Sequence, residues 1–74
     1  MKSFCYYGIN DRQLKAFRED GETVFNSGYP NKPIAYVNDH TWFDWNTHKP
    51  IAFEEEDIVY NWDTKKPILV ISIE

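Results

Sequence analysis

Hydrophobic and polar residues alternate along most of this chain, in short runs separated by polar stretches. Phe43 and Trp45 fall on one side of an extended segment, and Trp42 falls on the other. Tyr60 and Trp62 repeat the alternation. Because a period of two residues is typical of a β-strand, the pattern predicts short strands along the chain.

Polar stretches mark the reversals between these strands. Asn46-Thr47 and Asp63-Thr64 are expected to open turns, because Asn and Asp side chains hydrogen-bond to the backbone two residues on. Each turn leads into a Lys-Pro-Ile triplet, and proline is tolerated at the first position of a returning strand. The segments EDGE, VNDH and EEED separate one pair of strands from the next. Each unit therefore predicts a β-hairpin.

The hairpin sequence recurs along the chain. The Lys-Pro-Ile triplet stands at residues 32–34, 49–51 and 66–68, within the copies FNSGYPNKPIAY, FDWNTHKPIAF and YNWDTKKPILV. YYGINDRQLKAF is a weaker copy near the start, where a helix from Asp11 to Asp20, stopped by Gly21, is the alternative. The predicted repeats span residues 4–20, 24–38, 41–55 and 58–73.

Open edges of such hairpins invite association, and repeats avoid it by closing in a ring or by stacking in a line. Four units occupy nearly all 74 residues and leave no terminal caps. We therefore predict one all-β domain, residues 1–74, of three to four hairpin repeats in a closed pseudo-fourfold arrangement. The small side chains of Ala35 and Ala52 would let neighbouring strands approach closely at a central axis. The larger Leu69 stands at the matching position, so the symmetry is expected to be imperfect there.

The segments VFNSGYPNKPIAYV and IVYNWDTKKPILV resemble the four-fold β-flower family of small bacterial proteins. The resemblance covers residues 24–71 well and residues 4–20 loosely. His48 and Lys65 stand in turns where the family often has glycine. The resemblance implies four β-hairpins about a pseudo-fourfold axis, and it implies no activity, ligand or catalytic residue.

Composition limits the classes of function. The net charge of −4 without a basic stripe disfavours nucleic-acid binding. No run of about 18 apolar residues predicts a membrane span, and the start of the chain does not resemble a secretory signal, so a cytoplasmic protein is expected. No nucleophile motif, phosphate-binding loop or metal signature is present, so we predict a protein that is not an enzyme and needs no cofactor or metal.

Aromatic residues are the first candidates for a binding site. The chain holds three Trp, five Tyr and five Phe. Trp42, Trp45, Trp62 and Tyr36 are the candidates for stacking on carbohydrate or on choline-like cations. The competing interpretation is that the rings form the core, because each can bury about 150–250 Å². We expect Trp45 and Trp62 to be core residues and Trp42, which is out of phase, to be the exposed ring.

Other polar candidates are weaker. His40 and His48 are expected to be solvated turn residues, although a site with Asp39 or Asp44 is an alternative. The run EEED at residues 54–57 is expected to be a solvated acidic turn rather than a calcium site. Cys5 is the one cysteine, so a disulfide within the chain is excluded, and no base is expected beside it.

The last strand, PILVISI, is apolar on both faces. A strand of this kind is usually covered on both sides. Leu69, Ile71 and Ile73 are therefore candidates for a homo-oligomer interface, and closure of the ring against the N-terminal segment SFCYY is the alternative. The function expected is interaction with a protein partner or scaffolding, through homo-oligomerisation, and a small-ligand module is the second candidate.

Overall fold

The computed structural model describes residues 3–19, 21–28 and 30–73. Asp20, the last residue of the helix alternative, and the aromatic Tyr29 lie outside these ranges. The described residues form strands and turns and no helix. The eight strands are β1 (Phe4–Gly8), β2 (Leu14–Arg18), β3 (Thr23–Asn26), β4 (Pro33–Asn38), β5 (Thr41–Asp44), β6 (Pro50–Glu55), β7 (Ile58–Asn61) and β8 (Pro67–Ile73).

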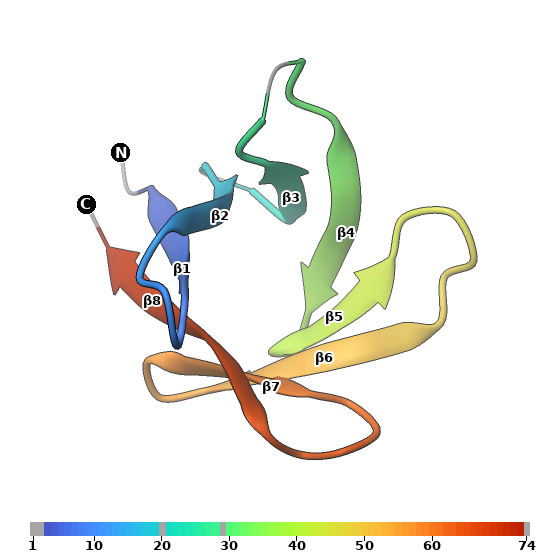
Figure 1. The fold of residues 1–74 in the computed structure, drawn as a ribbon. Helices are drawn as coiled ribbons and strands as arrows, with labels where there is room; N and C mark the ends of the chain where they lie inside the picture. The colour runs from blue at the N-terminus through green and yellow to red at the C-terminus, as the bar shows by residue number, and fades with distance from the viewer. Residues whose placement is uncertain (1–2, 20, 29, 74) are drawn as a thin grey trace.

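Each strand pairs antiparallel with its neighbours in the sequence, and β8 pairs with β1, so the sheet closes into a barrel. Figure 1 shows the strands arranged in a ring, with β1 beside β8. The predictions of an all-β fold and of a closed arrangement are confirmed. The helix alternative is wrong, because Leu14–Arg18 is a strand whose Phe17 is the partner of Cys5.

The barrel has two different ends, because alternate strands run in opposite directions. At the loop end lie the four longer connections, residues 9–13, 27–32, 45–49 and 62–66. At the terminal end lie the connections 19–22, 39–40 and 56–57 and both ends of the chain. Every side chain in the barrel can be placed relative to these two ends.

The interior is narrow and is filled in layers, with alternate strands contributing to each layer. The odd-numbered strands supply a buried layer of Tyr6, Val24, Trp42 and Val59. The even-numbered strands supply the buried alanines Ala16, Ala35 and Ala52, with Leu69 packed against them. Small side chains in one layer make room for the large rings in the next, so Ala35 and Ala52 lie inside as expected.

The assignment of faces to the tryptophans was wrong. Trp42 is 4% exposed and lies in the core, whereas Trp45 is 41% exposed and Trp62 is partly exposed. The alternation correctly separates Trp42 from Phe43, but it does not say which face is interior. A barrel this narrow admits few large rings, and Tyr6 and Trp42, in edge-to-face contact at 4.9 Å, occupy that space.

Most other aromatic rings lie on the outside of the barrel as stacked pairs on neighbouring strands. Their ring centroids are 5.7 Å apart for Phe17 and Phe25, 5.3 Å for Tyr36 and Phe43, and 5.2 Å for Phe53 and Tyr60. Cross-strand aromatic pairs of this kind stabilise a sheet. The aromatic residues therefore support the fold chiefly from the outer surface, and not as the core that was predicted.

The Lys-Pro-Ile triplets coincide with β-bulges. The register between β5 and β6 passes from Trp42 opposite Ala52 to Phe43 opposite Pro50, so Ile51 has no direct partner. Ile34 and Ile68 are skipped in the same way, and so is Lys15 in β2. A bulge adds one residue to one strand and bends that strand. The triplet thus marks the point at which each returning strand carries one extra residue.

The loops contain left-handed residues that are not glycine. His48 and Lys65 both have φ of 63°, and Arg12 in the first loop has φ of 60°. Side chains other than glycine cost about 1–2 kcal/mol in this conformation. Asp44 and Asn61 support these loops, because the oxygen of each side chain accepts hydrogen bonds from two backbone N–H groups that follow it.

We expect His48→Gly to be more stable than His48→Ala by about 1 kcal/mol, because glycine adopts positive φ without the steric penalty of a Cβ atom. Both changes remove the 3.3 Å contact between His48 Nδ1 and the Tyr36 hydroxyl, so alanine is the matched control. Urea unfolding followed by circular dichroism measures the difference. Equal stability of the two variants would contradict this account of the loop.

Candidate functional site

The terminal end of the barrel is lined by one residue from each even-numbered strand. Arg18, Val37, Glu54 and Ile71 each lie two positions beyond the interior residues of the alanine and leucine layer, so they also face inward. Val37 and Ile71 are buried, and the side chains of Arg18 and Glu54 are only 15% and 9% exposed. The barrel therefore carries a cation and an anion close to its interior at this end.

The Glu54 carboxylate is held by the two aromatic core residues. Its Oε2 accepts hydrogen bonds from Tyr6 Oη at 2.9 Å and from Trp42 Nε1 at 2.6 Å. Buried polar groups of Tyr and Trp need such partners, because a buried donor without an acceptor costs about 1–3 kcal/mol. The carboxylate thus satisfies the polar atoms of the two large rings.

Arg18 completes this network. Its Nε donates to the Tyr6 hydroxyl oxygen at 3.0 Å, and its Nη1 donates to the Gly21 carbonyl at 3.0 Å. Its Nη2 lies 3.8 Å from Glu54 Oε1, an ion pair without a hydrogen bond. The guanidinium also covers the face of Phe4, 4.2 Å from the ring centroid. Arg18 is therefore fixed in place by four different groups.

The pKa of the Tyr6 phenol is raised well above its usual value of about 10. Burial is the largest cause, since it disfavours the phenolate, and the negative charge of Glu54 adds to it. The hydrogen bond from Arg18 acts in the opposite direction but is outweighed. The folded protein therefore keeps the Tyr6 proton to a higher pH than the unfolded chain does.

A pocket with a volume of about 500 Å³ opens above this network. Apolar side chains form part of its wall, namely Phe4, Val37, Ile71 and Ile73. Glu54 and Arg18 also line it, and its rim carries Asp39, His40, Glu56 and Asp57. A concave apolar surface with a few polar groups is the usual form of a ligand site, and this volume lies within the usual range of about 300–1,000 Å³.

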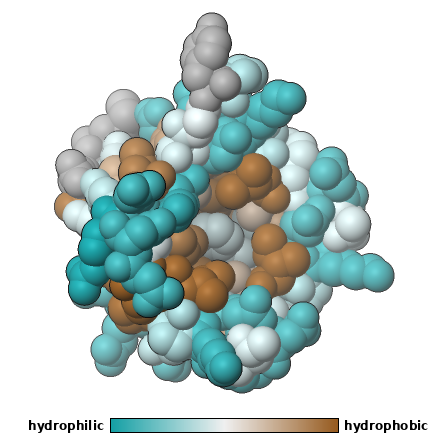
Figure 2. All heavy atoms as spheres, in the orientation of Figure 1, coloured by the Kyte–Doolittle hydropathy of each residue, from teal (hydrophilic) through white to brown (hydrophobic). Residues whose placement is uncertain are grey.

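The loop end has a different surface. The bulged residues Ile34, Ile51 and Ile68 are 39%, 39% and 37% exposed, and Leu14 and Trp45 are 42% and 41% exposed. Figure 2, which looks onto one end of the barrel, shows hydrophobic side chains around a central hollow and hydrophilic side chains toward the margin. Grouped exposed apolar side chains are typical of an interaction surface.

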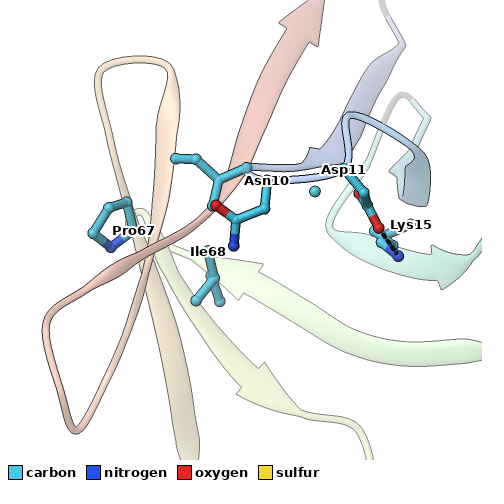
Figure 3. Close-up of a pocket in the computed structure, with 7 residues that line it drawn as sticks. Asn10, Asp11, Lys15, Pro67 and Ile68 are labelled. Carbon is cyan, nitrogen blue, oxygen red and sulfur yellow. Dashed lines mark ion pairs between the residues drawn. The ribbon is translucent and has the colours of Figure 1, made fainter.

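A smaller pocket of about 250 Å³ lies at the edge of the loop end, between the first loop and the start of β8. Figure 3 shows Asn10 of the first loop on the side of Pro67 and Ile68 of β8, and Asp11 on the side of Lys15. Lys15 reaches back to Asp11, with Nζ 2.8 Å from Oδ2. This ion pair is exposed, and such a pair contributes about 0–1 kcal/mol.

Charge is divided between the two ends. Among the described residues, the loop end carries six cationic side chains, Arg12, Lys15, Lys32, Lys49, Lys65 and Lys66, against the three carboxylates of Asp11, Asp44 and Asp63. The terminal end carries seven carboxylates, Glu19, Glu22, Asp39, Glu54, Glu55, Glu56 and Asp57, against Arg18. The barrel is therefore positive at one end and negative at the other.

The aromatic residues predicted to bind a ligand do not form one site. Trp42 is enclosed in the core. Trp45 and Trp62 lie at the loop end, each with its ring edge-to-face against an outer aromatic residue, Tyr36 or Phe53. Trp62 is also approached by Lys65, whose Nζ is 4.7 Å from the ring centroid. Carbohydrate or choline binding by these four residues stays a prediction.

The residues predicted for an oligomer interface also separate. Ile71 is 9% exposed and Leu69 packs against the core, so both serve the barrel interior. Ile73 is 54% exposed at the terminal end. The second apolar face of the last strand is thus covered by closure, since β8 pairs with β1 from Ile73 opposite Phe4 to Leu69 opposite Gly8. An interface through Ile73 stays a prediction.

The polar candidates lie apart as well. His40 lies at the terminal end and His48 at the loop end, and both are exposed. The oxygen Asp44 Oδ1 accepts the N–H groups of Thr47 and Asn46, which lower the pKa of that carboxyl. The solvated acidic turn was predicted wrongly for Glu54, which is enclosed, whereas residues 55–57 are exposed. In the described ranges, no group of three or more His, Cys, Asp or Glu residues is placed to hold a metal ion.

Sequence reasoning missed the pairing of Arg18 with Glu54. A signal for it is present, because Arg18, Val37, Glu54 and Ile71 each follow the interior residue of their strand by two positions. An arginine and a glutamate at positions that otherwise hold Val and Ile indicate a polar contact inside a barrel. Recognising it requires knowing which face of the strand is interior.

Comparison of the chain with family models, with curated proteins and with solved structures gave no match. The part of the chain that the structure describes contains no helix long and apolar enough to cross a membrane.

We expect the stability of the protein to fall as the pH rises above about 10, the usual pKa of tyrosine. The unfolded chain then releases the Tyr6 proton while the folded chain keeps it, so the unfolded state binds fewer protons and is favoured. Tyr6→Phe should remove that part of the alkaline loss. Unfolding by urea at several alkaline pH values measures the slope.

Tyr60→Phe is the matched control, because it removes a hydroxyl from the outer surface and leaves the Tyr6 network intact. An alkaline slope that is the same in Tyr6→Phe and in the unaltered protein would contradict the assignment.

Proposed function

We propose that this protein is a non-enzymatic interaction module that associates with further copies of itself, the loop end of one copy against the terminal end of the next. The observation that carries the proposal is the opposite charge of the two ends; the loop end also exposes several apolar side chains, and the terminal end exposes Ile73. Such surfaces complement each other without any change in the fold. Scaffolding by a homo-oligomer is the role that follows.

Charge complementarity determines the orientation of the contact. Two loop ends bring Lys49 and Lys66 against like charges, and two terminal ends bring Glu56 and Asp57 together. Like charges placed opposite each other disfavour both symmetric contacts. The remaining contact is heterologous, and a heterologous contact extends into a stack unless its rotation closes a ring.

Several charge pairs act together across the contact, because a single exposed ion pair contributes only about 0–1 kcal/mol, and apolar contact adds to their effect. Contact between the two ends would bury the exposed side chains of Ile34, Ile51 and Ile68 on one copy and of Ile73 on the next. Burial of apolar surface contributes about 25 cal/mol per Å². Strand pairing between copies does not contribute, because closure of the barrel leaves no edge strand.

A repeated hairpin is part of the same proposal, as the resemblance to the four-fold β-flower family implies. One backbone hydrogen bond recurs four times around the barrel, from an N–H group just after an odd-numbered strand to the carbonyl of a bulged residue. The four bonds are Ile9 to Ile68, Ser27 to Lys15, Trp45 to Ile34 and Trp62 to Ile51. The bulges recur at those same four carbonyl residues. These recurrences support four equivalent units around the barrel, which present the bulged residues together.

We expect the protein at about 0.01 M ionic strength to have a mass in solution above the 8.8 kDa of one chain, and to dissociate at about 1 M, where the Debye length shortens from about 30 to 3 Å. Lys49→Glu with Lys66→Glu leaves four cationic side chains against five carboxylates at the loop end, so that variant should be monomeric. Glu56→Lys with Asp57→Lys leaves five carboxylates against three cations at the terminal end, so that variant should associate more weakly than the unaltered protein. Light scattering measures the masses.

Mixing the two double variants provides the sharpest control. The unaltered acidic terminal end of the first then meets the unaltered basic loop end of the second, so the mixture should associate more strongly than either component alone. Lys49→Arg with Lys66→Arg keeps the charge and should associate as the unaltered protein does. A monomer at low ionic strength, or a mixture that stays monomeric, would overturn the proposal.

A further inference from the structure

The pocket at the terminal end is lined by the Glu54 carboxylate, whose side chain is 9% exposed and which has unused capacity to accept hydrogen bonds. Glu54 Oε2 accepts from Tyr6 and Trp42, whereas Oε1 accepts no hydrogen bond from any described residue. The nearest cationic atom to Oε1 is Arg18 Nη2 at 3.8 Å, and Arg18 directs Nε and Nη1 to other acceptors. A carboxylate has about four acceptor sites, so this oxygen can take a further donor.

The charge around the pocket favours a cation as that donor. Asp39, Glu56 and Asp57 stand at the rim, and Glu54 adds a fourth carboxylate below them. Arg18 is the cation among the lining residues, and its guanidinium already contacts Tyr6, Gly21 and Phe4. Like charges that line a concave surface concentrate their field inside it and attract ions of opposite charge.

The walls define the rest of the ligand. Phe4, Val37, Ile71 and Ile73 present apolar surface, so the group that carries the cation must be hydrocarbon. A quaternary ammonium fits poorly, because it has no N–H to give to Glu54 Oε1. The face of Phe4 that could receive it is also covered by Arg18 at 4.2 Å. A primary ammonium on an alkyl chain meets both requirements.

We propose that this pocket binds an alkylammonium group, with the ammonium donating to Glu54 Oε1 and the alkyl chain lying against Val37, Ile71 and Phe4. Two sources share this chemistry, a free alkylamine and a lysine side chain of a protein. The site goes beyond self-association and does not depend on it. Sequence reasoning assigned no ligand to these residues.

Trp42 reports on the site, because its indole donates to the same carboxylate. In a protein with Trp45→Phe and Trp62→Phe, Trp42 is the single tryptophan. We expect hexylammonium chloride to shift the Trp42 emission and its indole N–H resonance in a saturable way. Hexanol has the same alkyl chain without the charge. Its binding should be weaker by a factor of at least about ten, since a charge-assisted hydrogen bond contributes about 1.5–3 kcal/mol. Tetramethylammonium should also bind more weakly than hexylammonium.

Variants of the rim test the site without disturbing the core. Glu56→Gln with Asp57→Asn removes two exposed charges and should weaken hexylammonium binding several-fold. Asp63→Asn at the loop end is the matched control and should leave it unchanged. Glu54→Gln should weaken binding about tenfold or more. Circular dichroism establishes whether Glu54→Gln folds, and if it does not fold, the rim variants alone test the site.

The two sources are distinguished by adding Nα-acetyl-lysine amide, whose ε-ammonium is free, in place of hexylammonium. Equal binding identifies a lysine side chain as a sufficient ligand, and much weaker binding identifies a free alkylamine. The titration is carried out on Lys49→Glu with Lys66→Glu, in which self-association is expected to be absent, so failure of one proposal is distinct from failure of the other. An emission that does not change, or equal binding of hexanol and hexylammonium, would overturn the site.

Discussion

The pairing of β8 with β1 is the contact on which the rest of this structure depends. Every strand is only four to seven residues long, and a single hairpin of that length is marginal in water. Closure gives each strand two neighbours and leaves no exposed edge. It also creates the enclosed interior in which Tyr6, Val24 and Val59 lose all contact with solvent.

The narrowness of that interior explains both the core and the polar network. A layer of alanines and Leu69 leaves room for the rings of Tyr6 and Trp42, whose polar atoms must then find partners inside the barrel. Glu54 supplies the acceptor, and Arg18 forms an ion pair with it at 3.8 Å while contacting Phe4 and Gly21. One consequence is an acidic group near the base of an open pocket, which is a suitable environment for a cationic ligand.

The four longer loops produce a different surface at the opposite end. Each returning strand begins with a bulge that turns Lys15, Ile34, Ile51 or Ile68 out of the regular pairing. The lysines beside these residues make the loop end positive, whereas the short turns at the terminal end are rich in Asp and Glu. The same alternation of long loops and short turns therefore separates apolar, basic and acidic surfaces along the barrel axis. The proposed self-association depends on the opposite charges of the two ends, whereas the proposed amine site depends on the acidic terminal end alone.

The sequence alone determined the strands, the turns and the closed all-β class, because those depend on local alternation, on Asn and Asp in the loops, and on proline at the start of strands. It did not determine which face is interior, because a period of two residues is the same from either side. The predicted places of Trp42 and Trp45 are therefore the reverse of the observed ones, and Glu54 is enclosed where a solvated residue was expected. Only closure decided these positions, since Arg18 and Glu54 are far apart in the chain and meet across an interior whose width is set by all eight strands.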